Sequence, residues 1–68
     1  MSIGANIKER RIQMKMSQKE LSDSVNVTQS MICQIERGSK IPSVYLGKEI
    51  ADVLGCPLNE LLDQPKAG

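Results

Sequence analysis

The chain has 68 residues, which is enough for one domain. Its formal net charge of +1 does not by itself indicate a binding partner. Two cysteines without any histidine cannot supply the about four ligands of a structural zinc site, so we expect no metal and no other cofactor. Neither a signal-peptide core nor the ~18 consecutive apolar residues of a membrane span is present, so we expect reduced thiols and a cytoplasmic location.

Charge is distributed unevenly along the chain. Residues 1–40 carry seven basic and four acidic side chains, whereas residues 41–68 carry two basic and four acidic ones. The first part is therefore better suited to a polyanion such as DNA than the second. An ordinary solvated surface explains the same distribution equally well.

The first predicted helix covers about Ile3 to Lys15. Ile7, Arg11 and Met14 recur at spacings of four and three residues, which places them on one helical face. We expect this face to point toward the core of the domain.

The second predicted helix starts at a capping box, because Ser17 and Glu20 have the S-x-x-E spacing. It extends to about Val25 and is followed by Asn26. Asparagine tolerates the left-handed backbone conformation of a sharp turn better than most residues do. We therefore predict a tight turn between the second and third helices.

The three remaining helices are predicted from their end signals. Thr28 can cap the first of them and Gly38 can end it. The next runs from Pro42–Ser43 to residue 54, and the last is a short helix that begins at Pro57 and stops before Pro65. Five helices with short loops and an aliphatic core predict a single compact all-α domain over residues 1–68.

The third helix has two different faces. Its inner side is aliphatic, with Val27, Met31, Ile32 and Ile35. Its outer side is polar and mostly uncharged, with Gln29 beside a stripe formed by Ser30, Cys33, Gln34 and Arg37. Glutamine can pair with N6 and N7 of adenine in a major groove, and serine can pair with several bases. A neutral solvent-exposed face is the alternative interpretation.

Two charged residues fall on the inward sides of the first and third helices. They are Arg11 and Glu36, and a buried charge is costly unless it is paired. We therefore predict an ion pair that joins the two helices. In the alternative, each side chain reaches solvent separately.

The run SQKELSDSVNVTQSMICQIERGSKIPS, followed by IADVLGCPLNELL, resembles the lambda repressor/Cro-like, or XRE-type, helix-turn-helix family. The resemblance covers about Ile3 to Leu62, and its most specific parts are S-Q-x-E-L, I-E-R-G-x-x-x-P and A-x-x-L-G. It implies a five-helix lambda-repressor-like domain, with a helix-turn-helix unit at about 17–37 and a dimerising last helix at about 57–63. It also implies double-stranded DNA as the partner, in a bacterial cell or a phage-infected host.

The resemblance assigns roles to the residues that match the family pattern. It implies base reading by Gln29, Ser30, Cys33 and Gln34. It implies contact with the DNA backbone by Gln18, Thr28, Arg10, Arg11, Arg37 and Lys40, and an interhelical ion pair between Arg11 and Glu36. It implies a dimer surface at Pro57, Leu58, Leu61 and Leu62. Such a dimer would place its two recognition helices about 34–36 Å apart on a palindrome.

Five positions depart from the family pattern. Asn26 and Lys15 replace glycines, and Ser22 replaces alanine. Cys33 is unusual on a reading face, because a thiol is a weak hydrogen-bond donor that can also be oxidised. Gly47 replaces a core leucine and leaves a gap, which we expect to be filled by Tyr45, Leu46 or Met31.

These features predict a sequence-specific DNA-binding transcriptional regulator, most simply a homodimeric repressor that reads a palindromic operator. The alternative is a protein-interaction module or an antitoxin-like partner-binding protein built on the same fold. An enzyme is disfavoured, because the chain has no histidine, no base at a recognisable spacing from Cys33, and no phosphate-binding G-x-x-x-x-G-K loop. We expect no membrane partner and no small-molecule ligand.

Overall fold

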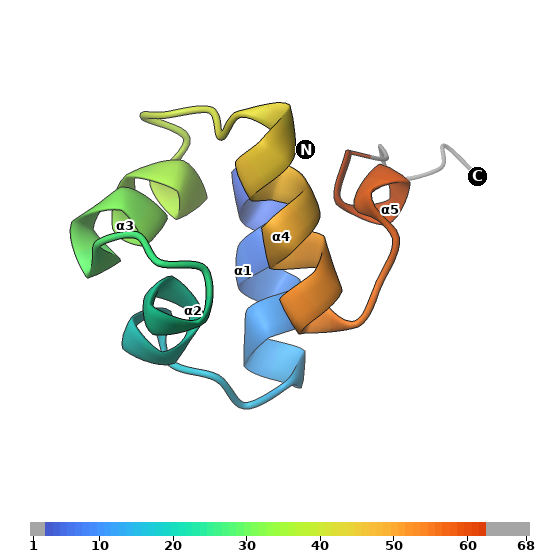
Figure 1. Ribbon diagram of the computed structural model, residues 1–68, viewed down its shortest axis with the longest axis horizontal. Helices are drawn as coiled ribbons and strands as arrows, with labels where there is room; N and C mark the ends of the chain where they lie inside the picture. Colours follow the sequence, from blue (N-terminus) through green and yellow to red (C-terminus); the bar gives the residue numbers. More distant parts are fainter. Residues whose placement is uncertain (1–2, 63–68) are drawn as a thin grey trace.

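The computed structural model describes residues 3–62. Over this range the chain forms α1 (Ile3–Gln13), α2 (Gln18–Ser24), α3 (Gln29–Arg37), α4 (Val44–Leu54) and α5 (Leu58–Leu62). The helices α2 and α3 lie on one side of α1 and α4, and α5 lies on the other (Figure 1). The predicted five-helix, all-α architecture is confirmed. The predicted end of the last helix, near Asp63 and Pro65, lies outside the described residues.

Local side-chain chemistry determines where the helices begin. The Ser17 hydroxyl accepts a hydrogen bond from the Glu20 N–H at 3.0 Å, and the Glu20 carboxylate accepts one from the Ser17 N–H at 2.8 Å. This is the predicted capping box. The Thr28 hydroxyl likewise accepts from the Met31 N–H at 3.1 Å, and Ser43 caps α4 in the same way. Each cap satisfies an N–H that has no partner within its helix.

Two residues other than glycine adopt the left-handed conformation. Asn26 has a φ of 58° between α2 and α3, as the sequence predicts, and Lys15 has a φ of 59° after α1. The turn at Lys15 follows the end of α1 at Gln13, so Met14 lies outside the helix and is exposed. The prediction that Met14 lies on the inward face of α1 is therefore wrong. Met16 packs against the core instead.

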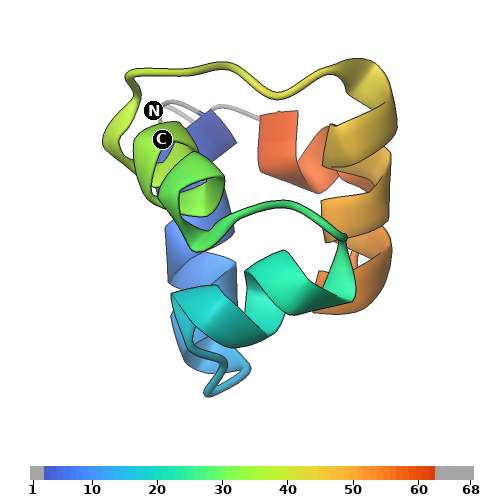
Figure 2. The same ribbon diagram turned by 60° about the vertical axis from the view of Figure 1, so that its left-hand side comes forward.

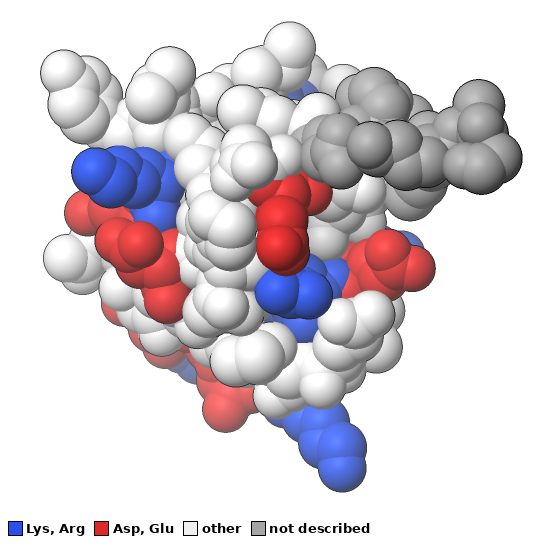
Figure 3. All heavy atoms as spheres, turned by 90° about the vertical axis from the view of Figure 1, so that its right-hand side faces the viewer, with Lys and Arg blue, Asp and Glu red and all other residues white. Residues whose placement is uncertain are grey.

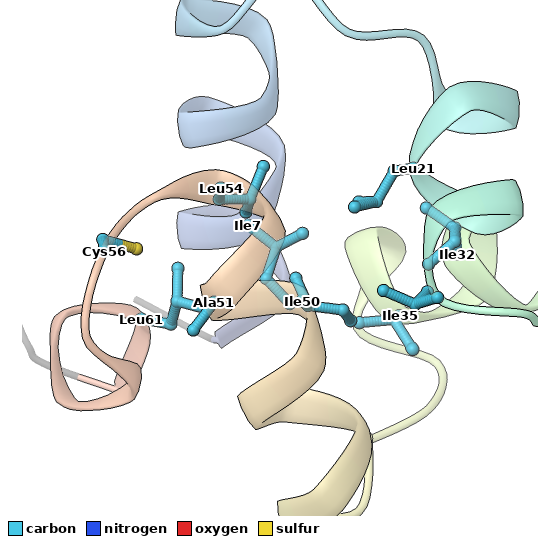
Figure 4. Packing of buried hydrophobic residues seen from close by; sticks show 10 residues of the cluster. Ile7, Leu21, Ile32, Ile35, Ile50, Ala51, Leu54, Cys56 and Leu61 are labelled. Carbon is cyan, nitrogen blue, oxygen red and sulfur yellow. The ribbon is translucent and has the colours of Figure 1, made fainter.

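The core fills the space enclosed by all five helices, which Figure 2 shows from a second side. In Figure 4, side chains from α1, α2, α3 and α4 converge at its centre, and Leu61 of α5 extends it. The buried members are Ile7, Leu21, Val25, Ile32, Ile35, Ile50, Ala51, Leu54, Cys56 and Leu61. Because full burial of one leucine or isoleucine side chain contributes about 1.5–3 kcal/mol, this cluster is the main source of stability.

The space beside Gly47 is filled from α5. A Cβ atom at this position would lie 3.3 Å from Cδ1 of Leu58. Tyr45 is 85% exposed, and Met31 has no atom within 4 Å of the added Cβ, so neither fills the gap as expected. The small residue therefore lets α5 pack closely on α4.

Polar and apolar contacts together hold α5 against α1. The side-chain amide of Asn6 donates to the Leu61 carbonyl at 2.7 Å, and Arg10 pairs with Glu60 at 3.1 Å. The Leu61 side chain is only 1% exposed. Leu61 is therefore a core residue of the monomer, and it adds little to the accessible dimer surface that the family resemblance implies.

Candidate nucleic-acid interface

The outer side of α3 is the candidate interface. This helix packs on α1 and α2 through its inner side, where Ile32 and Ile35 are buried. The four residues expected to read bases all lie on the opposite side. Gln29 and Ser30 are exposed, and Cys33 and Gln34 are half-buried. The side chains that a groove would have to reach are thus available at the surface.

Polar side chains line this face from its first turn onward. The Gln34 amide donates to the Ser30 hydroxyl one turn earlier, at 3.4 Å. Thr28 is exposed at the start of the helix, where its hydroxyl serves as the cap. The face is therefore rich in hydrogen-bonding groups and carries no charge until Arg37.

Exposed cations follow at the end of α3. Gly38, with a φ of 85°, ends the helix and turns the chain back toward it. The N–H groups of Ser39 and Lys40 both donate to the Gln34 carbonyl, at 2.9 and 3.3 Å. This turn holds the backbone of Lys40 at the end of α3, and the side chains of Arg37 and Lys40 are both exposed. On the α5 side of the molecule, by contrast, acidic and basic side chains are interspersed among uncharged ones (Figure 3).

The ion pair expected between Arg11 and Glu36 is present and buried. Arg11 Nε donates to Glu36 Oε2 at 2.7 Å, and Arg11 Nη2 donates to Oε1 at 3.0 Å. The two side chains are 10% and 2% exposed. Arg11 Nη1 also donates to the Met16 carbonyl at 2.7 Å. A two-pronged pair of this kind fixes both distance and orientation, so it sets how α1 packs on α3.

Glu36 also connects α3 to α2. The side-chain amide of Gln18 donates to Glu36 Oε1 at 3.0 Å, a contact that the sequence analysis missed. One carboxylate therefore links α3 to both α1 and α2. Glu36 therefore helps to fix the orientation of α3 relative to α1 and α2.

Two arginines expected at the DNA backbone form ion pairs within the domain. Each side-chain nitrogen of Arg11 donates to Glu36 or Met16, so its role is structural. Arg10 pairs with Glu60 of α5, which lies on the side of α1 away from α3. The buried Arg11 is not placed for the phosphate contact that the family resemblance implies, whereas the Arg10 side chain is 36% exposed and its contact with phosphate stays a prediction.

Several apolar side chains remain exposed outside the helix α3 itself. Among the residues expected at the dimer surface, Pro57 is exposed and Leu62 is 53% exposed, whereas Leu58 is half-buried beside Gly47. Three further apolar residues around the start of α4 are exposed, namely Ile41, Val44 and Tyr45, and the sequence analysis gave none of them a surface role. The sequence does indicate this exposure, because the run I-P-S-V-Y-L places apolar residues on more than one side of the helix start, and one helical face cannot bury them all.

Other kinds of site find little support in residues 3–62. No group of three His, Cys, Asp or Glu side chains in this range could hold a metal ion. Cys33 and Cys56 are both free thiols, and Cys56 is buried. Among the described helices, none has the length and apolar character needed to cross a membrane.

Comparison with known proteins assigns the chain to a family. Residues 7–61 match the family described as Helix-turn-helix. The chain belongs to the lambda repressor-like, or XRE-type, helix-turn-helix family. An uncharacterized HTH-type transcriptional regulator from Methanothermobacter thermautotrophicus is 39% identical to it over 49 residues, which are 72% of this chain and 71% of that protein. Because that organism is an archaeon, the expected bacterial or phage source is not supported.

Solved structures place this helix-turn-helix domain among regulators. SinR, described as the master regulator for biofilm formation and crystallised in complex with DNA, has a TM-score of 0.84 and 32% identity. The match covers 90% of this chain and 98% of that chain. The protein therefore falls in the class of helix-turn-helix DNA-binding transcriptional regulators.

The fold is also found within an enzyme. Hydroxypropylphosphonic acid epoxidase from S. wedmorenis has a TM-score of 0.78 and 28% identity over 97% of this chain. The match covers 34% of the epoxidase chain, and it is limited to the helix-turn-helix domain. It therefore gives no reason to assign that activity to this helix-turn-helix protein.

Proposed function

We propose that this protein is a sequence-specific transcriptional repressor, which acts as a homodimer and reads a palindromic operator by placing α3 in the major groove. The observation that carries the proposal is the exposed, uncharged polar face of α3 beside the exposed cations Arg37 and Lys40. The likeness to SinR, which was crystallised in complex with DNA, supports the same use of this face.

Each part of the face has a distinct task in this proposal. Gln29 and Ser30 in the first turn, with Gln34 one turn later, contact base edges, because their amides and hydroxyl both donate and accept hydrogen bonds. Arg37 and Lys40 contact phosphates at the far end of α3, where they add affinity without sequence preference. Thr28 contacts the DNA backbone at the near end. Gln18 does so through the N-terminus of α2, because its side-chain amide already donates to Glu36.

The homodimer is proposed to form through α5. Pro57 and Leu62 expose apolar surface there, next to the partly covered Leu58. Because α5 and α3 lie on different sides of α1 and α4, pairing through α5 leaves both recognition helices free for DNA (Figure 1). A symmetric dimer then reads the two halves of a palindrome.

Salt dependence separates this proposal from a protein-interaction module on the same fold. We expect the affinity for duplex DNA to fall steeply between about 50 and 200 mM salt, with a logarithmic slope of roughly 0.9 per phosphate contact. Fluorescence anisotropy of a labelled duplex measures this slope. Absent or salt-insensitive binding would favour the interaction module and contradict the proposed function.

Two substitutions distinguish base reading from phosphate contact. Gln29→Ala should cost about 1–3 kcal/mol of binding free energy on the preferred duplex and relax the preference at one position of each half-site. Lys40→Ala should weaken binding to all sequences alike and reduce the salt slope. Anisotropy titrations against the preferred duplex and single-base variants measure both effects. If the two variants behave identically, the assignment of readout to α3 is wrong.

A further inference from the structure

We propose that the start of α4, together with α5, forms one continuous surface that binds a second copy of this chain. The inference deepens the homodimer of the proposed function and rests on it. Three large apolar side chains lie in and just before the first turn of α4, and each is between 73% and 85% exposed. They are Ile41, Val44 and Tyr45, which we call the α4 patch. Neighbouring apolar side chains with this much exposure mark an interaction surface.

The α4 patch is continuous with the exposed apolar surface of α5. Val44 and Gly47 are three residues apart on α4, so they are neighbours on its surface. A Cβ atom at Gly47 would lie 3.3 Å from Cδ1 of Leu58, so Leu58 packs on α4 one turn from Val44. Leu62 lies one turn further along α5 and is 53% exposed. Because the start of α4 lies beside α5 in both Figure 1 and Figure 2, the two apolar groups belong to one surface.

The small size of α5 indicates that this helix does not form the dimer alone. A specific protein interface buries about 800 Å² on each partner, contributed by about 20–30 residues. The helix has five residues, of which Leu61 is buried and Leu58 is half-buried. Its exposed apolar surface therefore comes from Leu62 and the adjoining Pro57. The α4 patch supplies further apolar area, and Tyr45 provides an aromatic anchor of the kind that interfaces favour.

The charges around the α4 patch suit a second copy of the same chain. Lys48 and Glu49 follow Tyr45 by three and four residues, so they flank it on the surface of α4. Both are exposed, and neither forms an ion pair with another residue in the range 3–62. In a two-fold dimer each contact occurs twice, so Lys48 of one protomer can pair with Glu49 of the other. Duplex DNA would instead place phosphates beside Glu49 and beside apolar side chains that offer no hydrogen bond.

The dissociation constant of the dimer, measured by sedimentation equilibrium on the full chain, tests the inference. We expect Val44→Ser/Tyr45→Ser to raise this constant at least about 30-fold, the effect typical of losing a central aromatic contact. Ile12→Ser is the matched control, because Ile12 is also a large apolar residue and is 56% exposed. It lies in the last turn of α1, at the opposite end of the domain from the start of α4 (Figure 1). The control should leave the constant unchanged, and circular dichroism verifies that both variants fold.

Duplexes with one and with two half-sites show whether the α4 patch contacts protein or DNA. Val44→Ser/Tyr45→Ser should bind a single half-site as tightly as the wild type does, but lose cooperative binding to the palindrome. Equal weakening on both duplexes would assign the patch to DNA, and an unchanged dimer dissociation constant would assign the dimer to α5 alone. Either result overturns the inference. A wild-type chain that stays monomeric in solution and on the palindrome contradicts the proposed homodimer itself, so the two failures are distinguishable.

Discussion

Replacing Glu36 with alanine is expected to lower the free energy of unfolding by about 3–5 kcal/mol, because it leaves the Arg11 charge buried without its partner. The same change removes the acceptor of the Gln18 amide. A domain of this size has a total stability of roughly 3–10 kcal/mol, so the substitution should remove a large fraction of it. Urea unfolding followed by circular dichroism measures the loss.

An exposed ion pair on the same molecule supplies the control. Lys19 and Asp23 are 3.1 Å apart on α2, and their side chains are 71% and 66% exposed. Lys19→Ala should therefore cost no more than about 0.5 kcal/mol. The double variant Arg11→Met/Glu36→Leu should recover much of the stability, because a buried pair can be replaced by apolar side chains at little cost. Equal losses in Glu36→Ala and Lys19→Ala would contradict a structural role for the buried pair.

Replacing Gly4 with alanine is expected to destabilise the protein by about 3 kcal/mol, the upper part of the range for overpacking. Alanine is normally the better helix former, by up to about 1 kcal/mol, so propensity alone predicts the opposite sign. The added Cβ, however, would overlap the carbonyl oxygen of Ile35 and lie 3.1 Å from Cα of Glu36. These are backbone atoms of α3 that cannot rotate away, so α1 and α3 would have to separate.

Gly47→Ala is the matched control for that substitution. It also adds a methyl group to a buried helical glycine, but the neighbour is the flexible end of the Leu58 side chain at 3.3 Å. A shift of a few tenths of an ångström would accommodate it, so we expect the stability to remain within about 1 kcal/mol of the wild type. Thermal unfolding measures both variants. A neutral or stabilising Gly4→Ala would mean that α1 and α3 do not approach as closely as described.

Features that depend on neighbouring residues could be predicted from the sequence. The capping box at Ser17 and Glu20, the Thr28 cap and the turn at Asn26 each involve a few consecutive residues. Their chemistry therefore decides the local backbone before any tertiary contact forms. The two-faced pattern of α3 was readable for the same reason, because a helix of known boundaries fixes which side chains share a face.

Features that depend on distant parts of the chain were partly missed. The prediction for Met14 was wrong because α1 ends at Gln13. The turn that follows needs a left-handed backbone conformation at Lys15, a residue type that does not indicate one in the sequence. The close approach at Gly4 and the bond from Gln18 to Glu36 each require knowing which helices pack together. The Arg11–Glu36 pair was predictable across helices because two buried opposite charges have few other ways to be neutralised.

In the candidate site too, local features could be predicted from the sequence, whereas most contacts between helices could not. The outward position of Gln29, Ser30, Cys33 and Gln34 followed from helical periodicity. The family resemblance also placed Arg10 and Arg11 at the DNA backbone and Leu61 at a dimer surface. The structure instead gives these three residues partners within the domain. A one-dimensional pattern identifies a helix face, but it does not show whether a side chain there is already occupied by a neighbouring helix.

Selection from a random duplex pool tests the central claim most directly, namely that the outer face of α3 reads base edges. The wild-type chain and Gln29→Ala/Gln34→Ala are selected in parallel, and the enriched duplexes are sequenced. We predict that the wild type enriches a palindrome with half-sites about one helical turn apart, and that the variant loses the preference at defined positions of each half-site. Enrichment of the same sequences by both proteins would contradict the claim.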